Sequence, residues 1–226
     1  MNLFDYLNRI LSPNDIYRQL YPASSIRFSF RNYQSKDREA VLAIYDSNAP
    51  ERFPVGHRPH FEEFLNDCDN KYFIAESPEH GVIASGGAYA TGERTHTLCY
   101  GMVAPQFHGN GIGSALTLAR LIFGTRGAGP HFSFIYALNE SLSFYNRFGF
   151  SKVGKWTDEN GKEHPLAVIG YEANVLAPIK KVLDKRNHLL DNTLPLAEHP
   201  EMETVVTAGK QGTFDIQIKP RSPTRR

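Results

Sequence analysis

The stretch Tyr100-Gly-Met-Val-Ala-Pro-Gln-Phe-His-Gly-Asn-Gly-Ile-Gly-Ser114 combines a strand end, a glycine-rich loop and a helix start. Residues 95–103 are mostly apolar and predict a strand, which stops at Pro105 because proline cannot donate a ladder hydrogen bond. From Leu116 to Phe123, apolar residues recur at helical spacing. Between strand and helix stand Gly109, Gly111 and Gly113. Alternate glycines allow a ligand close to the backbone, and helix N-terminal amides suit a phosphate or pyrophosphate.

Two other glycine-rich phosphate motifs do not fit this stretch. A Walker loop requires Gly-Lys-Ser/Thr, but no lysine lies between Lys71 and Lys152. A dinucleotide fingerprint requires Gly-x-Gly-x-x-Gly and an acidic residue about 20 positions later. Here the third glycine comes one residue early, and no acidic residue lies between Glu93 and Glu140. Both of these nucleotide-binding classes are therefore excluded.

The stretch resembles the pyrophosphate loop of the GNAT superfamily of N-acetyltransferases. That loop has an apolar residue, any residue and proline, followed by Arg/Gln-x-x-Gly-x-Gly/Ala, and Val103-Ala-Pro105 and the residues from His108 to Gly113 match it. His108 departs from the family's Arg or Gln, but the backbone supplies most phosphate contacts in this family. The resemblance implies that acetyl-CoA, as acyl donor, binds to His108, Gly109, Asn110, Gly111, Ile112, Gly113 and Ser114.

The remaining patterns predict, in order, a strand, two helices, three strands, a helix, a strand, a helix and two strands. Strands at 72–76 and 82–90 are joined by a loop too short for a crossover, so they run antiparallel. The strand at 132–137 follows a helical crossover and is parallel to the strand at 95–103. This order matches the GNAT fold over residues 26–172. We expect an α/β (α+β) protein with a mixed, mostly antiparallel GNAT-type sheet flanked by helices.

Both ends of the chain extend beyond that fold. Residues 1–24 predict an N-terminal helical extension, 25–175 the GNAT acetyltransferase domain, and 176–226 a C-terminal extension with a helix, a candidate hairpin (204–207 with 213–219) and a basic tail. The N-terminal extension carries an apolar stripe, expected to pack on the domain or on a second copy, made of Leu3, Leu7, Ile10 and Leu11.

Composition narrows the class of protein. The 226 residues are 41% hydrophobic with a formal net charge of +1, as in ordinary globular proteins and without a reason to expect nucleic-acid or membrane partners. The two cysteines, Cys68 and Cys99, have neither metal-ligand spacing nor a disulfide pattern, so no metal site is expected. Without a signal peptide or a run of about 18 apolar residues, we expect a cytoplasmic monomer or homodimer.

Acyl transfer from a thioester to an amine needs a polarised carbonyl and an acid for the leaving thiolate. In the family a bulged central strand offers backbone N–H groups, and the resemblance places them at Met102 and Val103. Phe144-Tyr-Asn-Arg-Phe-Gly-Phe150 resembles the family's Tyr-x-x-x-Gly-Phe segment, whose tyrosine protonates the thiolate, so Tyr145 takes the role of catalytic acid. Asn139 resembles the family asparagine that binds the cofactor's amide arm, although it precedes Tyr145 by six residues, one fewer than usual.

The general base stays open at this stage. The central strand carries no carboxylate over residues 96–101. His96, Glu93 and a water relayed through backbone carbonyls are the alternatives. Cys99 lacks the pattern of a nucleophile and is expected to be a buried strand cysteine.

The expected function is an acetyl-CoA-dependent N-acetyltransferase that moves the acetyl group directly to an amine of a small molecule or peptide. The alternative is a catalytically silent acyl-CoA-binding domain that acts as a sensor or interaction module; the intact loop and Tyr145 favour the enzyme. Acceptor recognition is expected in residues 48–60 and in the turn at 157–164. The first segment is basic, which fits an acceptor with a carboxylate or phosphate, because it holds Arg52, His57, Arg58 and His60.

Overall fold

The computed structural model describes residues 26–49, 51–54, 56–68, 71–158, 160–190, 196–199, 201–208 and 214–221. The predicted N-terminal helices with their apolar stripe, and residues 222–226 of the basic tail, lie outside the described residues. Among the described helices, none is long and apolar enough to cross a membrane.

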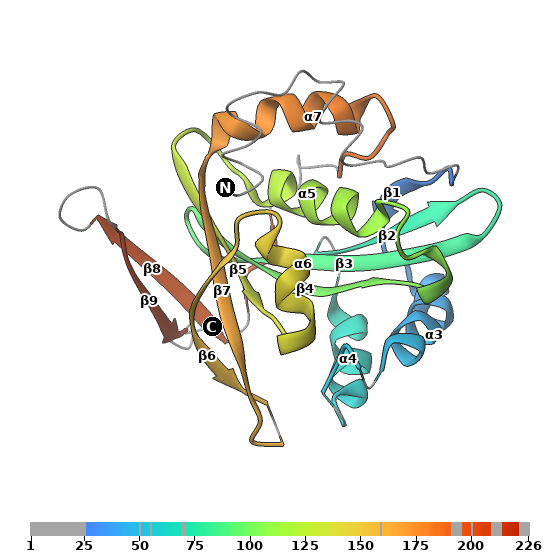
Figure 1. The fold of residues 1–226 in the computed structure, drawn as a ribbon, viewed down its shortest axis with the longest axis horizontal. Helices are drawn as coiled ribbons and strands as arrows, with labels where there is room; N and C mark the ends of the chain where they lie inside the picture. The colour runs from blue at the N-terminus through green and yellow to red at the C-terminus, as the bar shows by residue number, and fades with distance from the viewer. Residues whose placement is uncertain are drawn as a thin grey trace.

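A seven-stranded sheet in the order β1-β2-β3-β4-β5-β7-β6 forms the centre of the protein, and β8 and β9 form a separate ribbon (Figure 1). The sheet strands are β1 (Ser29–Asn32), β2 (Tyr72–Ser77), β3 (Gly81–Gly92), β4 (Thr95–Val103), β5 (Pro130–Tyr136), β6 (Ser151–Thr157) and β7 (Glu163–Glu172). The ribbon strands are β8 (Met202–Ala208) and β9 (Phe214–Pro220). The described α-helices are α3 (Arg38–Asn48), α4 (Arg58–Phe64), α5 (Ile112–Gly124), α6 (Asn139–Asn146) and α7 (Ala177–Asp184). Short 3-10 turns are η1 (Ser35–Asp37), η2 (Leu65–Asp67), η3 (Pro105–Phe107) and η4 (Ala173–Leu176).

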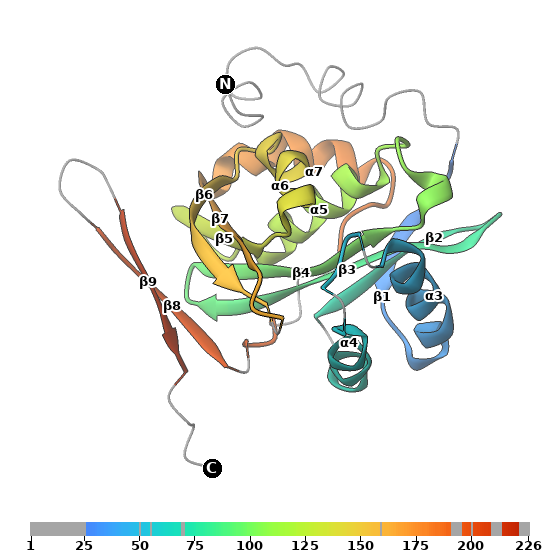
Figure 2. The ribbon, with the colours of Figure 1, turned by 60° about the horizontal axis from the view of Figure 1, so that its bottom comes forward.

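Helices cover both faces of this sheet. Figure 2 shows α5, α6 and α7 on one face and α3 and α4 on the other. Each face has its own apolar cluster, one centred on α5 and the other on α3 and α4. Every strand pair is antiparallel except β4–β5, which is parallel. The predicted fold class, a mixed and mostly antiparallel sheet flanked by helices, is confirmed.

The parallel pair β4–β5 separates halfway along β4. Its pairing runs from Thr95↔Phe132 to Leu98↔Ile135, whereas β4 continues to Val103. The second half of β4 therefore has no partner on its β5 side. This separation opens the sheet at its centre, next to the glycine-rich loop.

A β-bulge on β4 accompanies the separation. The β3–β4 register passes from Gly87↔Cys99 to Ser85↔Met102, so β4 has one residue more than β3 in this interval. Within it, Tyr100 has a φ of +42°, a left-handed conformation that is uncommon for a residue with a side chain. Bulges bend a strand and increase its local twist, which explains why β4 turns away from β5 here.

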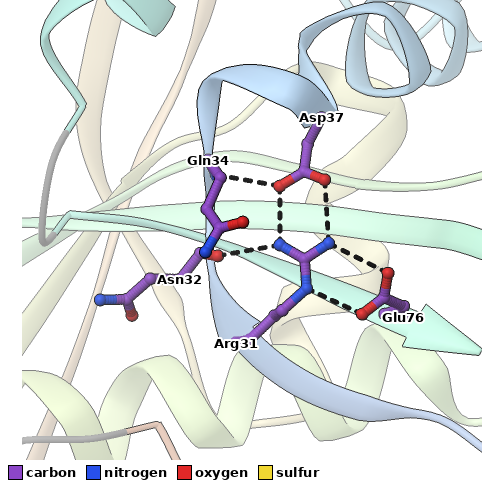
Figure 3. A network of polar contacts seen from close by, with 5 residues as sticks. All are labelled: Arg31, Asn32, Gln34, Asp37 and Glu76. Atoms are coloured by element: carbon purple, nitrogen blue, oxygen red, sulfur yellow. Dashed lines mark hydrogen bonds and ion pairs between the residues drawn. The ribbon is translucent and has the colours of Figure 1, made fainter.

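An ion-pair network fixes β1 to β2 and to the start of the first helical segment (Figure 3). Arg31 donates to Asp37 at 2.7 and 2.9 Å and to Glu76 at 2.8 and 3.0 Å. The Asp37 side chain is 5% exposed, whereas that of Glu76 is 43% exposed. Burial alone would raise the pKa of Asp37, but the hydrogen bonds from Arg31 and the Gln34 amide outweigh it and lower that pKa. The Arg31 hydrogen bonds also lower the pKa of Glu76.

Replacing Arg31 with methionine should lower the free energy of unfolding by roughly 2–4 kcal/mol at pH 7, because Asp37 stays buried without its cation. Both carboxyl groups have lowered pKa values in the folded state. Their contribution is therefore present above their unfolded pKa values of about 4 and is lost as the pH falls through the folded values. Denaturant unfolding from pH 7 to 3 should show the deficit of the variant shrinking. Arg27→Met is the control, because the Arg27–Glu79 pair is exposed; an equal loss in both variants would contradict this account.

The C-terminal extension contains the predicted hairpin and a helix shorter than the predicted 178–190. Helix α7 ends at Asp184 because Asn187 takes a left-handed φ of +55° and the His188 amide bonds back to Leu183 O at 3.0 Å. Such a left-handed residue terminates helices. The β8–β9 ribbon contributes Val206 and Ile218 to a small cluster that covers β5 and β7, made with Phe132, Phe134 and Val168.

Candidate active site

The glycine-rich loop presents open backbone to solvent. Gly111 is the N-cap of α5 with a φ of +75°, and Gly109 has a φ of +78° and open space around it, since an added Cβ would meet no heavy atom within 4 Å. The first helical hydrogen bond of α5 runs from Ala115 N to Gly111 O at 2.9 Å. The amides of Ile112 and its two successors therefore precede the helical hydrogen bonds and are available to a ligand. This arrangement fits a pyrophosphate, as the family resemblance implies.

Two polar side chains of the loop hold its shape. Asn110 Nδ2 donates to Phe107 O at 3.2 Å and to His108 O at 3.1 Å. His108 Nε2 donates to Val103 O at 2.9 Å, which links the loop to the end of β4. Asn110 does not line the cavity described next. Both side chains thus stabilise the conformation of the loop, and their contact with the cofactor stays a prediction.

A cavity of about 1180 Å³ passes through the gap between β4 and β5. One end is bounded by the loop, α5 and α6, and the other by α4 and the segment before it. The predicted site residues that line this cavity are Met102, Val103, His108, Gly109, Gly111, Ile112, Gly113, Ser114 and Tyr145. The structure thus brings nine of the predicted residues together.

Asn139 lies apart from this group. The N-cap of α6 is Leu138, so Asn139 is the first helical residue and not the cap. Its Nδ2 points to Glu163 O of β7 at 3.5 Å, and the residue does not line the cavity. A spacing one residue shorter than in the family rotates the side chain about 100° around the helix. The geometry gives no support to the predicted contact with the cofactor's amide arm.

The strand pairing separates the two predicted polarising amides. Ala104 N donates to Ile83 O at 2.9 Å, so this pair belongs to the β3–β4 ladder. Because hydrogen-bonded and non-hydrogen-bonded pairs alternate, Met102 also faces β3, while the N–H and C=O of Val103 face away from it. Val103 O indeed accepts side-chain hydrogen bonds from Asn48 and His108. The geometry therefore favours Val103 N–H over Met102 N–H as the donor in the gap.

Tyr145 reaches the cavity from α6. Its ring packs edge-on against Phe144 at 5.0 Å and Phe150 at 5.6 Å, and the residue is 7% exposed. Its hydroxyl has no hydrogen-bond partner among the described residues, and the residue lines the cavity. At Gly113, a Cβ would lie 3.5 Å from the Phe144 ring, so α5 begins close to α6. The apolar packing fixes the ring and leaves the hydroxyl available to a ligand.

His57 is a candidate base that the sequence analysis did not single out. Its Nε2 lies 3.1 Å from the hydroxyl of Tyr100, the residue at the β4 bulge, and both line the cavity. Tyr100 O accepts a hydrogen bond from the Tyr72 hydroxyl at 3.2 Å, which supports the bulge from the same side. His57 belongs to an irregular stretch without periodicity, and only its basic neighbours suggested a role.

The two side chains proposed as bases from sequence lie elsewhere. His96 is fully buried against α5, where a Cβ on Gly124 would lie 2.5 Å from its ring. Burial lowers the pKa of His96 to about 3, with the positive charges of His131 and Arg126 acting in the same direction. Neither His96 nor Glu93 lines the cavity that the described residues form. His57 therefore replaces them as the candidate.

Cys99 lines the cavity but is not poised as a nucleophile. Burial raises the pKa of its thiol to about 12, although the Arg120 charge opposes this shift. A thiol with this pKa carries almost no thiolate at neutral pH. Cys99 lies on β4 as predicted, but it is half-buried rather than fully buried.

A buried arginine lies under the bulge. Arg120 of α5 is 1% exposed and donates to Gly87 O at 3.4 Å and Cys99 O at 3.3 Å. A Cβ at Gly101 would lie 2.8 Å from its guanidinium, so this glycine provides the space for it. Here Arg120 satisfies carbonyl groups at the point where the ladder is interrupted.

A second cavity of about 570 Å³ adjoins the first. Its walls are residues 51–54 on one side and the β6–β7 turn on the other, including Asp158 and His164, whose side chains lie 3.0 Å apart. These are the two segments in which acceptor recognition was predicted. The structure brings them together, and their role in binding an acceptor remains a prediction.

The β4–β5 pair separates, the glycine-rich loop starts α5 and Tyr145 lies on α6, and all three features border one cavity. Residues 68–152 match the family model described as an acetyltransferase (GNAT) domain. Over these residues the match agrees with the GNAT resemblance that the sequence predicted.

The chain is similar to several solved structures. Ard1 from Thermoplasma volcanium is 16% identical with a TM-score of 0.50, covering 64% of this chain and 97% of that one. A provisionally named phosphinothricin N-acetyltransferase is 26% identical with a TM-score of 0.47, covering 64% and 98%. Rv2747 from Mycobacterium tuberculosis, crystallised with CoA, is 18% identical with a TM-score of 0.44, covering 55% and 72%. No curated protein matches the chain.

Proposed function

We propose that this protein transfers an acetyl group from acetyl-CoA to an amine in the cavity where β4 parts from β5. One observation carries the proposal: the open loop at the start of α5, Val103 and Tyr145 all line this cavity, so a phosphate site, a carbonyl-polarising donor and a proton donor share it. Acetyl-CoA supplies the acetyl group as a thioester.

The residues have complementary tasks in this reaction. The loop amides hold the diphosphate, and Val103 N–H donates to the acetyl oxygen; one such preorganised donor is worth roughly 3–4 kcal/mol in the transition state. His57 Nε2 accepts the proton that the attacking amine loses, with the Tyr100 hydroxyl beside it. The Tyr145 hydroxyl gives a proton to the departing sulfur. One C–N bond forms as the C–S bond breaks, and the proton count balances.

The acceptor enters from the α4 side of the sheet. That half of the cavity is bordered by Arg52, Phe53, Pro54 and His60, and it continues into the second cavity. The loop and Tyr145 lie at the opposite half. Donor and acceptor therefore approach the gap from opposite sides, which fits direct transfer without an acyl-enzyme.

The test combines isothermal titration of acetyl-CoA with release of free thiol in the presence of amines. The panel comprises free amino acids, ω-amino acids, polyamines, aminoglycosides and peptides. We expect acetyl-CoA to bind and at least one class of amine to accelerate thiol release. Binding without acceleration by any amine would favour a silent acyl-CoA-binding domain, and absence of binding would contradict the loop assignment.

A further inference from the structure

Part of the C-terminal extension, which lies outside residues 68–152, forms one wall of the cavity on the side where we place the acceptor. Strand β2 begins at Tyr72, which pairs with Gly87 of β3. The backbone of Ala90, three residues further along β3, therefore has no partner from β2. The segment after α7 takes this place: Ala90 N donates to Ala197 O at 2.8 Å, and His199 N donates to Ala90 O at 2.7 Å. The Tyr136 hydroxyl then donates to Met202 Sδ at 3.0 Å. The C-terminal extension is therefore anchored at the cavity, which it lines with Glu198, His199, Glu201 and Met202.

Tyr89 is a largely buried residue of this wall. The residue is 8% exposed, lines the cavity, and its hydroxyl has no hydrogen-bond partner within the described parts of the chain. Burial raises the pKa of Tyr89, so the hydroxyl keeps its proton and remains a donor. Its ring contacts His199, with ring centroids 5.0 Å apart, and Lys71, whose Nζ lies 5.4 Å from the ring centroid.

Hydrogen bonds fix the tautomer of His199. Its Nδ1 accepts the backbone N–H groups of Glu201 at 3.2 Å and Met202 at 3.1 Å. Backbone amides only donate, so Nδ1 carries no proton and the neutral ring holds its proton on Nε2. Burial also lowers the pKa of His199, which keeps the ring neutral at pH 7. The other ring nitrogen is thus a fixed donor.

Lys71 is the third donor. It is 8% exposed and lines the cavity, and its ion pair with Asp67 at 3.2 Å involves a carboxylate that is 96% exposed. A pair with so exposed a partner is weakened by solvent, so the ammonium keeps capacity for a buried anion. Of the acidic residues at the rim, Glu198 is paired with Arg221, and Glu63 and Glu201 are exposed. Lys71, Tyr89 and His199 therefore lie against one another, and the carboxylates named at the rim are either paired or exposed.

We propose that Lys71, Tyr89 and His199 form a subsite for a carboxylate of the acceptor. Tyr89 lies opposite Thr97, which is three residues before Tyr100 at the bulge. Along β4, three residues at about 3.3 Å each therefore separate the subsite from the gap between β4 and β5, a distance of about 10 Å. This separation selects an amine whose carboxylate is remote, such as an ω-amino acid or the end of a short peptide. The inference rests on the proposed transferase function.

The experiment uses the full chain with CoA bound and compares two product-like probes, 6-acetamidohexanoate and its methylamide, by isothermal titration. We expect the carboxylate to bind at least ~10-fold tighter than the amide, since hydrogen bonds to a charged group are stronger than those to a neutral one. Tyr89→Phe and Lys71→Met should each reduce this preference several-fold while retaining CoA binding. Tyr33→Phe makes the same ring change outside the cavity and should leave the preference unchanged.

A parallel activity series separates this inference from the proposed function. Thiol release is measured with 6-aminohexanoate, its amide and hexylamine. Equal kcat/KM for the three amines, or equal binding of both probes, would overturn the subsite while leaving the transferase intact. Selective binding of the carboxylate without thiol release from any amine would contradict the transferase and retain the subsite. If neither probe binds to a protein that binds CoA, the subsite is also overturned.

Discussion

Replacing Tyr145 with phenylalanine should lower the rate constant for acetyl transfer by about 10²–10⁴-fold, the usual range for loss of general acid catalysis. The ring is held by Phe144 and Phe150, and its hydroxyl has no partner among the described residues, so the substitution should leave the fold unchanged. Acetyl-CoA affinity should change little. The loss should therefore appear in kcat rather than in binding.

The measurement is single-turnover transfer with an accepted amine, together with titration of acetyl-CoA. Tyr33→Phe is the matched control, because Tyr33 lies outside the cavity lining. Measuring the single-turnover rate constant across pH distinguishes the loss of a proton donor from a change in structure. If the Tyr145→Phe variant transfers acetyl groups at the wild-type rate at every pH, the tyrosine has a packing role and water supplies the proton.

Replacing Gly111 with aspartate should weaken acetyl-CoA binding by roughly 100-fold relative to Gly111→Asn. Gly111 has a φ of +75°, a conformation that asparagine and aspartate tolerate better than other residues with side chains. The two variants therefore have nearly the same shape and backbone strain, and they differ in one negative charge. Beside a diphosphate near the surface, that charge costs about 2.7 kcal/mol, which corresponds to this 100-fold loss.

Isothermal titration of both variants gives the comparison directly. Gly81→Asp controls for the conformation, since Gly81 has a φ of +68° in the β2–β3 turn and open space around it. It should bind acetyl-CoA like the wild type. Equal affinity of the Gly111→Asp and Gly111→Asn variants would show that the diphosphate does not lie on this loop.

The sequence by itself determined those strands, turns and helices whose formation depends on neighbouring residues in the chain. The apolar run up to Pro105, the three alternate glycines and the helical stripe fixed the β4–loop–α5 unit, because strand, turn and helix propensities depend on near neighbours. The short loop between β2 and β3 fixed their antiparallel direction, and the crossover through α5 fixed the parallel β4–β5 pair. Tyr145 could be predicted as a site residue because the segment that resembles the family motif, residues 144–150, is contiguous in the sequence.

Tertiary structure decided what depends on distant residues. The role of His57 follows from its contact with Tyr100 across 43 positions, and no periodicity marks it. Asn139 lies outside the cavity lining, and one residue of spacing on a helix changes the direction of a side chain by about 100°. The β3–β4 register decided that Val103 N–H, and not Met102 N–H, faces the gap. Alternation of apolar residues in the sequence cannot predict this register, because a bulge shifts it by one residue. The proposed subsite combines Tyr89 of β3 with His199, which lies more than 100 residues later in the sequence. Only the folding of the intervening chain brings these two residues into contact.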